Sequence, residues 1–486
     1  MKPPKPQRPR KQHAEPWSSQ PSLAVSQIVQ IEKPIYGGAF LARMEGKAVF
    51  VPLTLPGEQV RVRITQNKRG YDTADPDEII TAAAERIAPA CPHFGACGGC
   101  HYQHTNYETQ LAFKQTILRE TLERGGVQAP EEIAVLSADP WHYRNRIRLA
   151  FDPEGNPGYR GRQSHAGVPS DRGPQGAVFA PWGGSDRSSP LGWHAIIPIR
   201  ECPIAAPLLV EAVQSAASVL RNFAPALRPA EISLFCDAAE SALLVTIFSA
   251  NRSRIRFDEL AQALHERIPA LKGAELVAEG RPGEQIQAQS PHTVAAWGAI
   301  SLAYRAAGFD YRVDHGAFFQ VNRWLVDALV ERVTAGHSGS LAWDLFAGVG
   351  LFARQLTASF ARVVAVESAP SAVKALEENL KGTAGTAVRS ATLDFLRRSR
   401  KPAHPDWSRP DLIVVDPPRT GLGAEITTLL AEIAAPALVY VSCDPATLAR
   451  DLRALLATGY AIQSITLADL FPQTFHLETV VQLRRS

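Results

Sequence analysis

The sequence predicts an α/β protein whose last third forms a doubly wound parallel sheet, preceded by a small all-β barrel and an α+β central part. From Trp324 onward, apolar strands alternate with helices, the pattern of a parallel sheet covered on both faces. Between about Leu23 and Ile87, short runs rich in valine and isoleucine are separated by turn sequences, as in a five-stranded barrel. The 486 residues exceed what one hydrophobic core usually serves, so we expect about three folded domains.

The chain begins with a basic tail that is too rich in proline and charge to fold and that lacks the apolar centre of a signal peptide. We therefore expect four segments, namely a disordered tail at 1–22, the barrel at 23–88, the central domain at 89–315 and the parallel-sheet domain at 316–486.

The composition, 45% hydrophobic and 20% charged residues, is that of an ordinary soluble protein. No apolar run approaches the roughly 18 residues that a membrane span needs, so we expect no membrane partner. The formal net charge of +3 by itself indicates little about nucleic acid.

Local groups of cations say more than the net charge. In the barrel, Lys68, Arg69 and Tyr71 offer two cations and a ring in one turn, which suits a phosphate and a base. A barrel without a ligand has the same pattern. The arginines of WHYRNRIRLAF alternate, so a strand would place all three on one face, either to meet phosphates or as a solvated charged face; they are Arg144, Arg146 and Arg148.

The central part begins with a cysteine-rich segment, CPHFGACGGCHYQH, in which Cys91, Cys97 and Cys100 are spaced C-x5-C-x2-C. Three thiolates so close together require a shared cation, and both iron–sulfur clusters and structural zinc usually take a fourth ligand. The best remaining donor is Cys202, because Cys236 ends an apolar strand-like run. The spacing does not separate a [4Fe–4S] cluster from zinc.

A helix follows the cysteines. The capping box TNYE at Thr105–Glu108 predicts that this helix begins there and runs to about Arg124.

The first strand, turn and helix of the parallel sheet have the form of a cofactor site. In LAWDLFAGVGLF a strand ends in Asp344 and is followed by a turn with Gly348 and Gly350. The next strand, RVVAVE, ends in Glu367, where a carboxylate would hold the two hydroxyls of a ribose. An acid before the turn, without G-x-G-x-x-G, favours S-adenosylmethionine over a dinucleotide.

Two further strands deliver reactive side chains to the same edge. DLIVVD ends in Asp416, and ALVYVS is followed by Cys443 in a polar turn that opens a helix. Substrates bind at this edge in folds of this kind, so both side chains are expected to face one pocket. The alternatives without a catalytic role are that Cys443 is an ordinary core thiol and that Asp416 only caps the end of its strand.

The final unit, Ile462–Leu467 and His476–Leu483, is expected to form a hairpin that adds an antiparallel edge strand. This hairpin would bring Glu478 close to the rim of the pocket, although a glutamate on an edge strand can also be a plain surface residue. The three side chains then suggest a nucleophile, a positioning carboxylate and a base.

The motifs DPPRTG, SCDPATLARD and FPQTFHLET, together with the four cysteines, resemble those of the RNA uracil-C5 methyltransferase family over nearly the whole chain. The resemblance implies a Rossmann-like class I methyltransferase domain, an N-terminal OB-like barrel of the TRAM type, S-adenosyl-L-methionine as cofactor and a [4Fe–4S] cluster. It also implies an RNA partner, chiefly 23S rRNA and otherwise tRNA, and a cytoplasmic protein, which we expect to be a monomer.

The resemblance assigns roles by position. Cys443 takes the place of the nucleophile, Glu478 that of the base that removes a proton, and Phe318 that of an aromatic near the target base. The S-adenosylmethionine contacts would be Gln320, Phe346, Glu367 and Asp416. The cluster ligands would be Cys91, Cys97, Cys100 and Cys202.

Two positions depart from the family pattern. Leu351 follows the glycine turn where relatives often have a small polar residue, and Thr392 stands where many have Asp or Asn near the adenine.

Two other functions fit parts of the pattern. An amino-methyltransferase would need an aromatic residue where Arg419 stands and has no use for Cys443. A non-catalytic RNA-binding or iron–sulfur protein could keep the fold without the chemistry.

Overall fold

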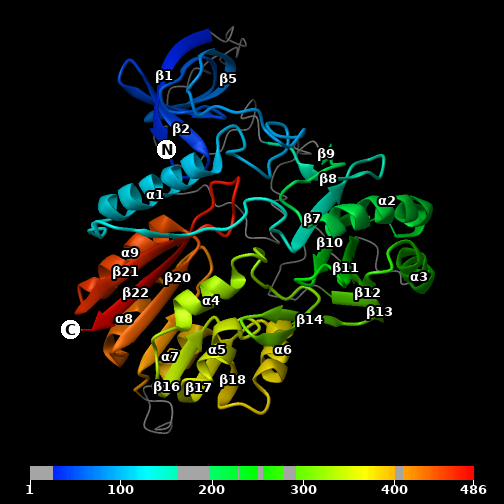
Figure 1. Ribbon diagram of the computed structural model, residues 1–486, viewed down its shortest axis with the longest axis vertical. Coiled ribbons are helices and arrows are strands. Elements are labelled where there is room, and N and C mark those ends of the chain that lie inside the picture. The colour runs from blue at the N-terminus through cyan, green and yellow to red at the C-terminus, as the bar shows by residue number, and fades with distance from the viewer. Residues whose placement is uncertain are drawn as a thin grey trace, which may run out of the picture.

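The structure, a computed structural model, describes residues 26–162, 196–227, 229–249, 256–278, 292–399 and 409–485. The predicted disordered tail at 1–22 lies outside the described residues. Figure 1 shows the barrel at the top, a mixed sheet with its helices to one side, and a larger sheet between helices below. No helix in the described ranges is long and apolar enough to cross a membrane.

The predicted barrel is confirmed, since five strands close on themselves in the order β1-β2-β3-β5-β4. Its core is the apolar face of each strand, including Val29, Phe40, Val49 and Val60, all fully or almost fully buried. The strands are β1 (Ser26–Pro34), β2 (Ala39–Met44), β3 (Lys47–Pro52), β4 (Gln59–Asn67) and β5 (Tyr71–Thr81).

The central part contains a seven-stranded sheet of order β13-β12-β11-β10-β7-β8-β9, against which α2 and α3 pack. A separate hairpin, β14-β15, follows and contributes to the core of the next sheet. The elements are β7 (Arg146–Phe151), β8 (Pro157–Arg160), β9 (Ile196–Pro198), α2 (Pro207–Leu227), β10 (Pro229–Cys236), β11 (Leu243–Ser249), α3 (Phe257–Arg267), β12 (Leu271–Ala278), β13 (His292–Gly298), β14 (Ser301–Ala306) and β15 (Phe309–Asp314).

The C-terminal sheet has eight strands in the order β18-β17-β16-β19-β20-β22-β21-β6, and β16 to β20 run parallel as predicted. Its elements are β6 (Ala134–Leu136), α4 (Val326–Thr334), β16 (Gly339–Leu345), α5 (Leu351–Leu356), β17 (Phe360–Glu367), α6 (Pro370–Leu380), β18 (Gly385–Arg389), α7 (Thr392–Ser399), β19 (Leu412–Val415), α8 (Gly423–Ile433), β20 (Ala437–Ser442), α9 (Pro445–Leu456), β21 (Tyr460–Ala468) and β22 (Glu478–Arg485).

The alternation of side chains between the two faces of β16 explains why this sheet is covered on both faces. Leu341, Trp343 and Leu345 point into a core formed with α7, α8 and α9, while Ala342 points into a core formed with α4, α5 and α6. Side chains alternate across a strand, so a strand that is apolar at both sets of positions must be buried on both sides.

The final hairpin is correctly predicted as β21 and β22, but the expectation that it forms the edge of the sheet is wrong. β22 lies between β20 and β21, and the short strand β6 pairs with β21 on its outer side. This places β22, and therefore Glu478 at its start, inside the sheet instead of at its margin. Because β6 comes from a segment far earlier in the chain, the sequence around the hairpin does not indicate that β6 pairs with it.

Helix α1 (Tyr107–Arg124) ends where predicted, but its cap is Asn106, whose side chain accepts a hydrogen bond from the backbone N–H of Thr109. The predicted cap, Thr105, instead donates its hydroxyl to the carbonyl of Glu85. Side chains of α1 share a core with α9 and the C-terminal sheet. How the chain divides into domains between α1 and the sheet stays a prediction.

The loop between β21 and β22 (residues 469–477), called the β21–β22 loop below, contacts both the barrel and the central part, and its Phe475 lies in the barrel core. The fully buried Lys114 of α1 forms an ion pair of 2.5 Å with Asp469 and also donates to the carbonyl of Phe471. Tyr143 from the central part donates to the carbonyl of Pro472, at 3.1 Å. A buried charge pair that loses one partner is costly, so these contacts fix the loop that leads into Glu478.

Candidate active site

Cys443 lies in the turn between β20 and α9, where its side chain is half-buried. The next residue, Asp444, caps α9 by accepting hydrogen bonds from the backbone N–H groups of Ala446 and Thr447 at 3.0 and 2.9 Å. Pro445 occupies the first helical turn, where its missing N–H costs nothing. The sequence SCDPAT thus ends the strand sharply and holds Cys443 at the carboxyl edge of the sheet.

The register of β20 against β22 brings Glu478 to Cys443. These strands are antiparallel, with Ser442 opposite Thr479, so the next position along β20 lies opposite the start of β22. Glu478 is only 4% exposed, so the alternative that it is a plain surface residue is wrong. Its charge raises the pKa of Cys443, so the carboxylate lies near the thiol. Directly opposed residues in an antiparallel pair lie within side-chain contact range.

Asp416 directly follows β19, which is parallel to β20 and adjacent to it. Its side chain is half-buried, and the two prolines after it keep the chain extended before it turns at Gly421. The structure therefore brings Cys443, Glu478 and Asp416 to one edge of the sheet, close enough to influence each other's ionisation.

Burial dominates the electrostatics of this group. It raises the pKa of Asp416 to about 7, and burial together with the Asp416 charge raises the pKa of Glu478 well above its ordinary value. Burial, followed by Glu478 and Asp416, also raises the pKa of the Cys443 thiol, whereas Arg419 opposes this shift. These shifts favour the protonated form of the thiol in the free protein.

The glycine turn after β16 has the features of a cofactor loop. Buried Asp344 accepts a hydrogen bond from the N–H of Ala353, at 2.8 Å, and burial raises the pKa of Asp344 to about 8. Glu367 at the end of β17 accepts from the N–H of Gly348 at 2.9 Å, which ties the second strand tip to the turn. Phe346 adopts a positive φ of 64°, a conformation that costs energy in a residue with a side chain and that recurs at functional sites.

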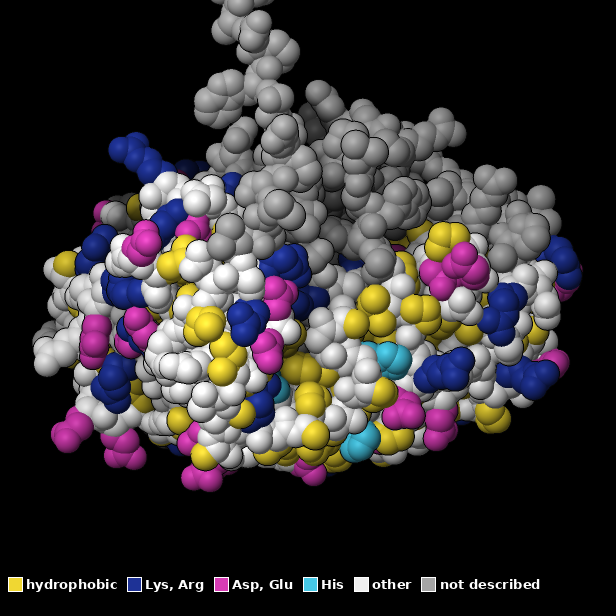
Figure 2. Space-filling view, turned by 90° about the horizontal axis from the view of Figure 1, so that it is seen from above, with side chains coloured by type: hydrophobic (Ala, Val, Ile, Leu, Met, Phe, Trp, Pro, Cys, Tyr) yellow, Lys and Arg dark blue, Asp and Glu magenta, His cyan; other side chains and the backbone are white. Residues whose placement is uncertain are grey.

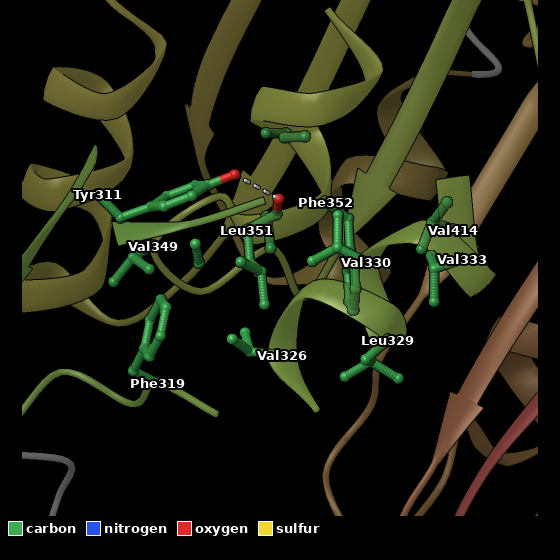
Figure 3. Close-up of a cluster of buried hydrophobic side chains, with 14 of the residues drawn as sticks. Tyr311, Phe319, Val326, Leu329, Val330, Val333, Val349, Leu351, Phe352 and Val414 are labelled. Atoms are coloured by element: carbon green, nitrogen blue, oxygen red, sulfur yellow. Dashed lines mark hydrogen bonds between the residues drawn. The ribbon is translucent and has the colours of Figure 1, made fainter. Parts of the chain in front are cut away.

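The FFQVN segment reaches the same turn through Phe319. Figure 3 shows Phe319 beside Val349 and Leu351, with the Tyr311 hydroxyl donating to the carbonyl of Leu351 at 3.0 Å. Its two neighbours in sequence differ in exposure: Gln320 is buried, and Phe318 is 62% exposed. An exposed phenylalanine on a loop packed against the turn is available for an external ligand.

The two departures from the family pattern are both buried. Leu351 packs in the core beneath the turn, and Thr392 begins α7 directly after β18. Neither residue presents a charged group to the cofactor edge.

The cysteine segment lies against β8. The N–H of Gly98 donates to the carbonyl of Arg160 at 3.1 Å, and the Tyr159 hydroxyl lies 3.9 Å from the sulfur of Cys202. All four predicted ligands are half-buried, and burial is the largest cause that raises the pKa of each thiol, to about 11 for Cys97. The charges of neighbouring cysteines add to the rise for Cys97, Cys100 and Cys202. Within the described ranges, no three His, Cys, Asp or Glu side chains converge closely enough to hold one metal ion.

The alternating arginines are engaged within the protein. Arg146 donates to the carbonyl of Ala317 at 2.7 Å, and Arg148 pairs with Glu231. The predicted contact with phosphates therefore has no support from Arg146 or Arg148. On the face shown in Figure 2, lysines and arginines are interleaved with acidic side chains, so charge alone does not define an RNA surface.

Sequence reasoning assigned no role to three residues that the structure places at this site. Arg419 and His476 lie inside motifs that were recognised, and their side chains meet at 3.1 Å. Tyr36 comes from the turn between β1 and β2 of the barrel, packs edge-on against Phe475 at 5.6 Å and hydrogen-bonds the side chain of Asp444. No local pattern in the barrel sequence could have shown that its turn reaches this site.

Comparison with known proteins identifies relatives of both the barrel and the C-terminal part of the chain. A family model described as tRNA (Uracil-5-)-methyltransferase matches residues 405–486, and a TRAM domain model matches residues 26–76. The 23S rRNA (uracil(1939)-C(5))-methyltransferase RlmD of Shewanella piezotolerans is 30% identical over 472 residues, which cover 95% of this chain and 95% of the relative. The protein of the same name from Pseudomonas savastanoi pv. phaseolicola is 30% identical over 476 residues, covering 95% and 94%.

Among solved structures, the Pyrococcus abyssi tRNA (uracil-54, C5)-methyltransferase in complex with S-adenosyl-L-homocysteine superposes with a TM-score of 0.68. The match has 21% sequence identity and covers 94% of this chain and 100% of that one, so it shows a shared fold.

The fold is thus that of a methyltransferase with an N-terminal TRAM barrel. Identity of 30% along almost the entire length of the relatives establishes more: the chain belongs to the RNA (uracil-C5) methyltransferase family. This confirms the family predicted from the motifs. The roles of individual site residues and the iron–sulfur cluster stay predictions.

Proposed function

We propose that this chain transfers a methyl group from S-adenosylmethionine to C5 of one uridine in 23S rRNA, with Cys443 as nucleophile and Glu478 as base. The observation that carries the proposal is the strand register that sets Glu478 opposite Cys443, with Asp416 on the neighbouring strand. An amino-methyltransferase has no use for a thiol paired with a carboxylate in this way.

Cys443 has the first chemical task. C5 of uracil is a weak nucleophile, but bonding of the sulfur to C6 shifts the C5–C6 π electrons toward the C4 carbonyl and creates an enolate. The thiol must lose its proton as this bond forms, because its raised pKa keeps it protonated in the free protein. S-adenosylmethionine, when bound, supplies the methyl group that the enolate carbon takes up.

Glu478 has the second task. After methylation, C5 carries both the new methyl group and a proton, and the adduct is released only when a base removes that proton. The C5–H electron pair then re-forms the C5–C6 double bond, and the sulfur leaves C6 as a thiolate. A base held beside the thiol, away from water, suits a proton abstracted within the same pocket.

The cofactor would lie along the carboxyl edge next to this pair. Glu367 would hold the ribose hydroxyls, and Phe346, Gln320 and Asp416 would complete the contacts. The support is spatial: Glu367 is hydrogen-bonded to the glycine turn, and Phe319 packs the FFQVN segment against that same turn. Phe318, exposed on the same segment, would stack on the target base once the base leaves the RNA helix.

The RNA target is tested by offering the purified protein unmodified 23S rRNA and total tRNA in the presence of S-adenosylmethionine. We expect 5-methyluridine to form in the rRNA, at a site located by nuclease digestion and mass spectrometry. An rRNA fragment in which the modified uridine is replaced by cytidine serves as the matched control and should take up no methyl group. Methylation of tRNA with none in rRNA would contradict the proposed target.

We propose that the four cysteines bind a [4Fe–4S] cluster, with Cys91, Cys97, Cys100 and Cys202 as its ligands. The support is their proximity: the charges of neighbouring cysteines raise the pKa of Cys97, Cys100 and Cys202. A cluster binds one thiolate on each of its irons, whereas a single zinc ion draws all four sulfurs to about 2.3 Å from one centre. A cluster would also supply the positive charge that buried thiolates require.

Anaerobic purification is expected to give a brown protein that contains iron and acid-labile sulfide. Replacing Cys97 by serine should remove most of the iron, whereas Cys236→Ser, at a buried cysteine outside the group, should leave the iron content unchanged. Iron, sulfide and zinc are measured on the same samples. Stoichiometric zinc without sulfide would contradict the cluster.

A further inference from the structure

Arg419 and His476 form a side-chain pair beside the proposed nucleophile and base. Arg419 lies in the loop after β19, and its Nη2 is 3.1 Å from Nδ1 of His476, two residues before Glu478. The imidazole ring is half-buried between aromatic rings, with centroid distances of 4.3 Å to Phe475 and 5.6 Å to Phe471. This packing leaves the ring little freedom to turn away from the guanidinium.

The backbone of Arg419 is held from the other side by α9. The Thr447 hydroxyl donates to the carbonyl of Arg419 at 3.1 Å, and Arg450 donates to the carbonyl of Thr420 at 2.9 Å. Gly421 has a φ of +71°, and a Cβ added there would lie 2.5 Å from the carboxylate of Asp451. The loop after β19 therefore packs so closely against α9 that only glycine fits at position 421.

The groups that face Cys443 are mostly acidic. Asp416 follows β19, Glu478 begins β22, Asp444 adjoins the thiol, and Tyr36 approaches from the barrel. Arg419 is the cation that opposes them, because it favours the charged forms of both Cys443 and Glu478.

His476 itself remains neutral. Burial lowers its pKa well below the ordinary value, and the cations Arg419, Lys114 and Arg144 act in the same direction. A neutral ring can accept a hydrogen bond at Nδ1, and the contact with an arginine, which only donates, requires that it does. The proton of the ring is then on Nε2.

We propose that Arg419 stabilises the negative charge that passes from the Cys443 sulfur to the uracil ring during addition, and that His476 is the positioning residue that aims Arg419. The inference rests on the proposed function, since it presumes that Cys443 is the nucleophile. Its physical basis is that a fixed cation aimed at developing charge, in a pocket with little water, requires no reorganisation during the reaction.

The test compares matched variants in single-turnover formation of the covalent adduct with RNA that carries 5-fluorouridine. Arg419→Gln removes the charge but keeps an N–H that can donate to His476, and we expect it to slow adduct formation about 100-fold. His476→Leu and His476→Asn both remove the ring, but only asparagine keeps an acceptor near the place of Nδ1. We expect about a 10-fold loss for leucine and recovery to within about threefold of wild type for asparagine.

The dependence of the rate on pH separates an electrostatic role from a structural one. Since Arg419 lowers the pKa of Cys443, its loss should move the rise in adduct formation to higher pH, while RNA affinity and melting temperature change little. Adduct formation by Arg419→Gln at the wild-type rate and pH would overturn the role of Arg419. Equal rates for His476→Asn and His476→Leu would overturn that of His476.

These failures are distinguishable from failure of the proposed function. If Cys443→Ala still captures the RNA, the nucleophile itself is wrong. If Cys443→Ala is inert while Arg419→Gln, His476→Leu and His476→Asn all react like wild type, the proposed function stands and the Arg419–His476 inference falls.

Discussion

Replacing Cys443 by alanine is expected to abolish both methylation and covalent capture of 5-fluorouridine RNA, while RNA binding persists. The sulfur is the atom that makes C5 reactive, and Cys443 is the cysteine that directly follows β20 at this edge. Loss of a covalent nucleophile removes most of the catalytic rate, so we expect a fall of at least about 1,000-fold. Capture is measured on denaturing gels, and RNA affinity by fluorescence anisotropy.

Cys236→Ala provides the matched control for that experiment. Cys236 is fully buried at the end of β10, and burial raises its pKa in the same direction as that of Cys443. It lies in the central sheet, away from Asp416 and Glu478, so its loss should reduce stability slightly and leave capture intact. Normal adduct formation by Cys443→Ala would show that another group attacks C6.

Several features of the fold were predictable because they follow from local sequence. Strands β19 and β20 are apolar at successive positions, and Asp416 and Cys443 directly follow these runs, so the sequence alone indicates that they share an edge. The five-stranded barrel was equally predictable, because valine-rich runs separated by turns permit few other folds.

The remaining features depend on pairing between distant segments, which local patterns do not encode. β22 lies between β20 and β21, and β6, from a segment far earlier in the chain, covers the outer side of β21, so Glu478 at the start of β22 is buried inside the sheet. Tyr36 reaches Asp444 only because the barrel rests on the β21–β22 loop. The helix cap moved from Thr105 to Asn106 because the Thr105 hydroxyl found a carbonyl in the segment after the barrel.

The arginines of β7 show how a correct periodicity can mislead about function. Arg146 and Arg148 have the predicted alternation, but Arg146 lies 4.4 Å over the ring of Phe235 and Arg148 pairs with Glu231. A regular row of cations is an RNA contact only when its charges are free, and this depends on what the neighbouring strand supplies.

Replacing Glu478 by glutamine is expected to block the last step of the reaction, whereas loss of Cys443 blocks the first. The reaction should start in this variant but not finish. Glutamine has the same size and cannot accept the C5 proton, so Cys443 should attack, the methyl group should transfer, and the thioether should remain. We expect a stable protein–RNA adduct that carries the labelled methyl group, with turnover reduced at least about 100-fold. Glu425→Gln, at an exposed carboxylate of α8, is the control and should turn over normally.

The pH dependence of adduct release adds a second test of the same assignment. Burial and the charge of Asp416 raise the pKa of Glu478 well above its ordinary value, and only the ionised carboxylate can take a proton. In the wild type, release should therefore slow as the pH falls and quicken as it rises, whereas the little release left in Glu478→Gln should not follow this titration. A glutamine variant that turned over near the wild-type rate, with the same pH profile, would show that a different group is the base. Asp416, whose pKa burial raises to about 7, would then be the neighbouring carboxylate to replace next.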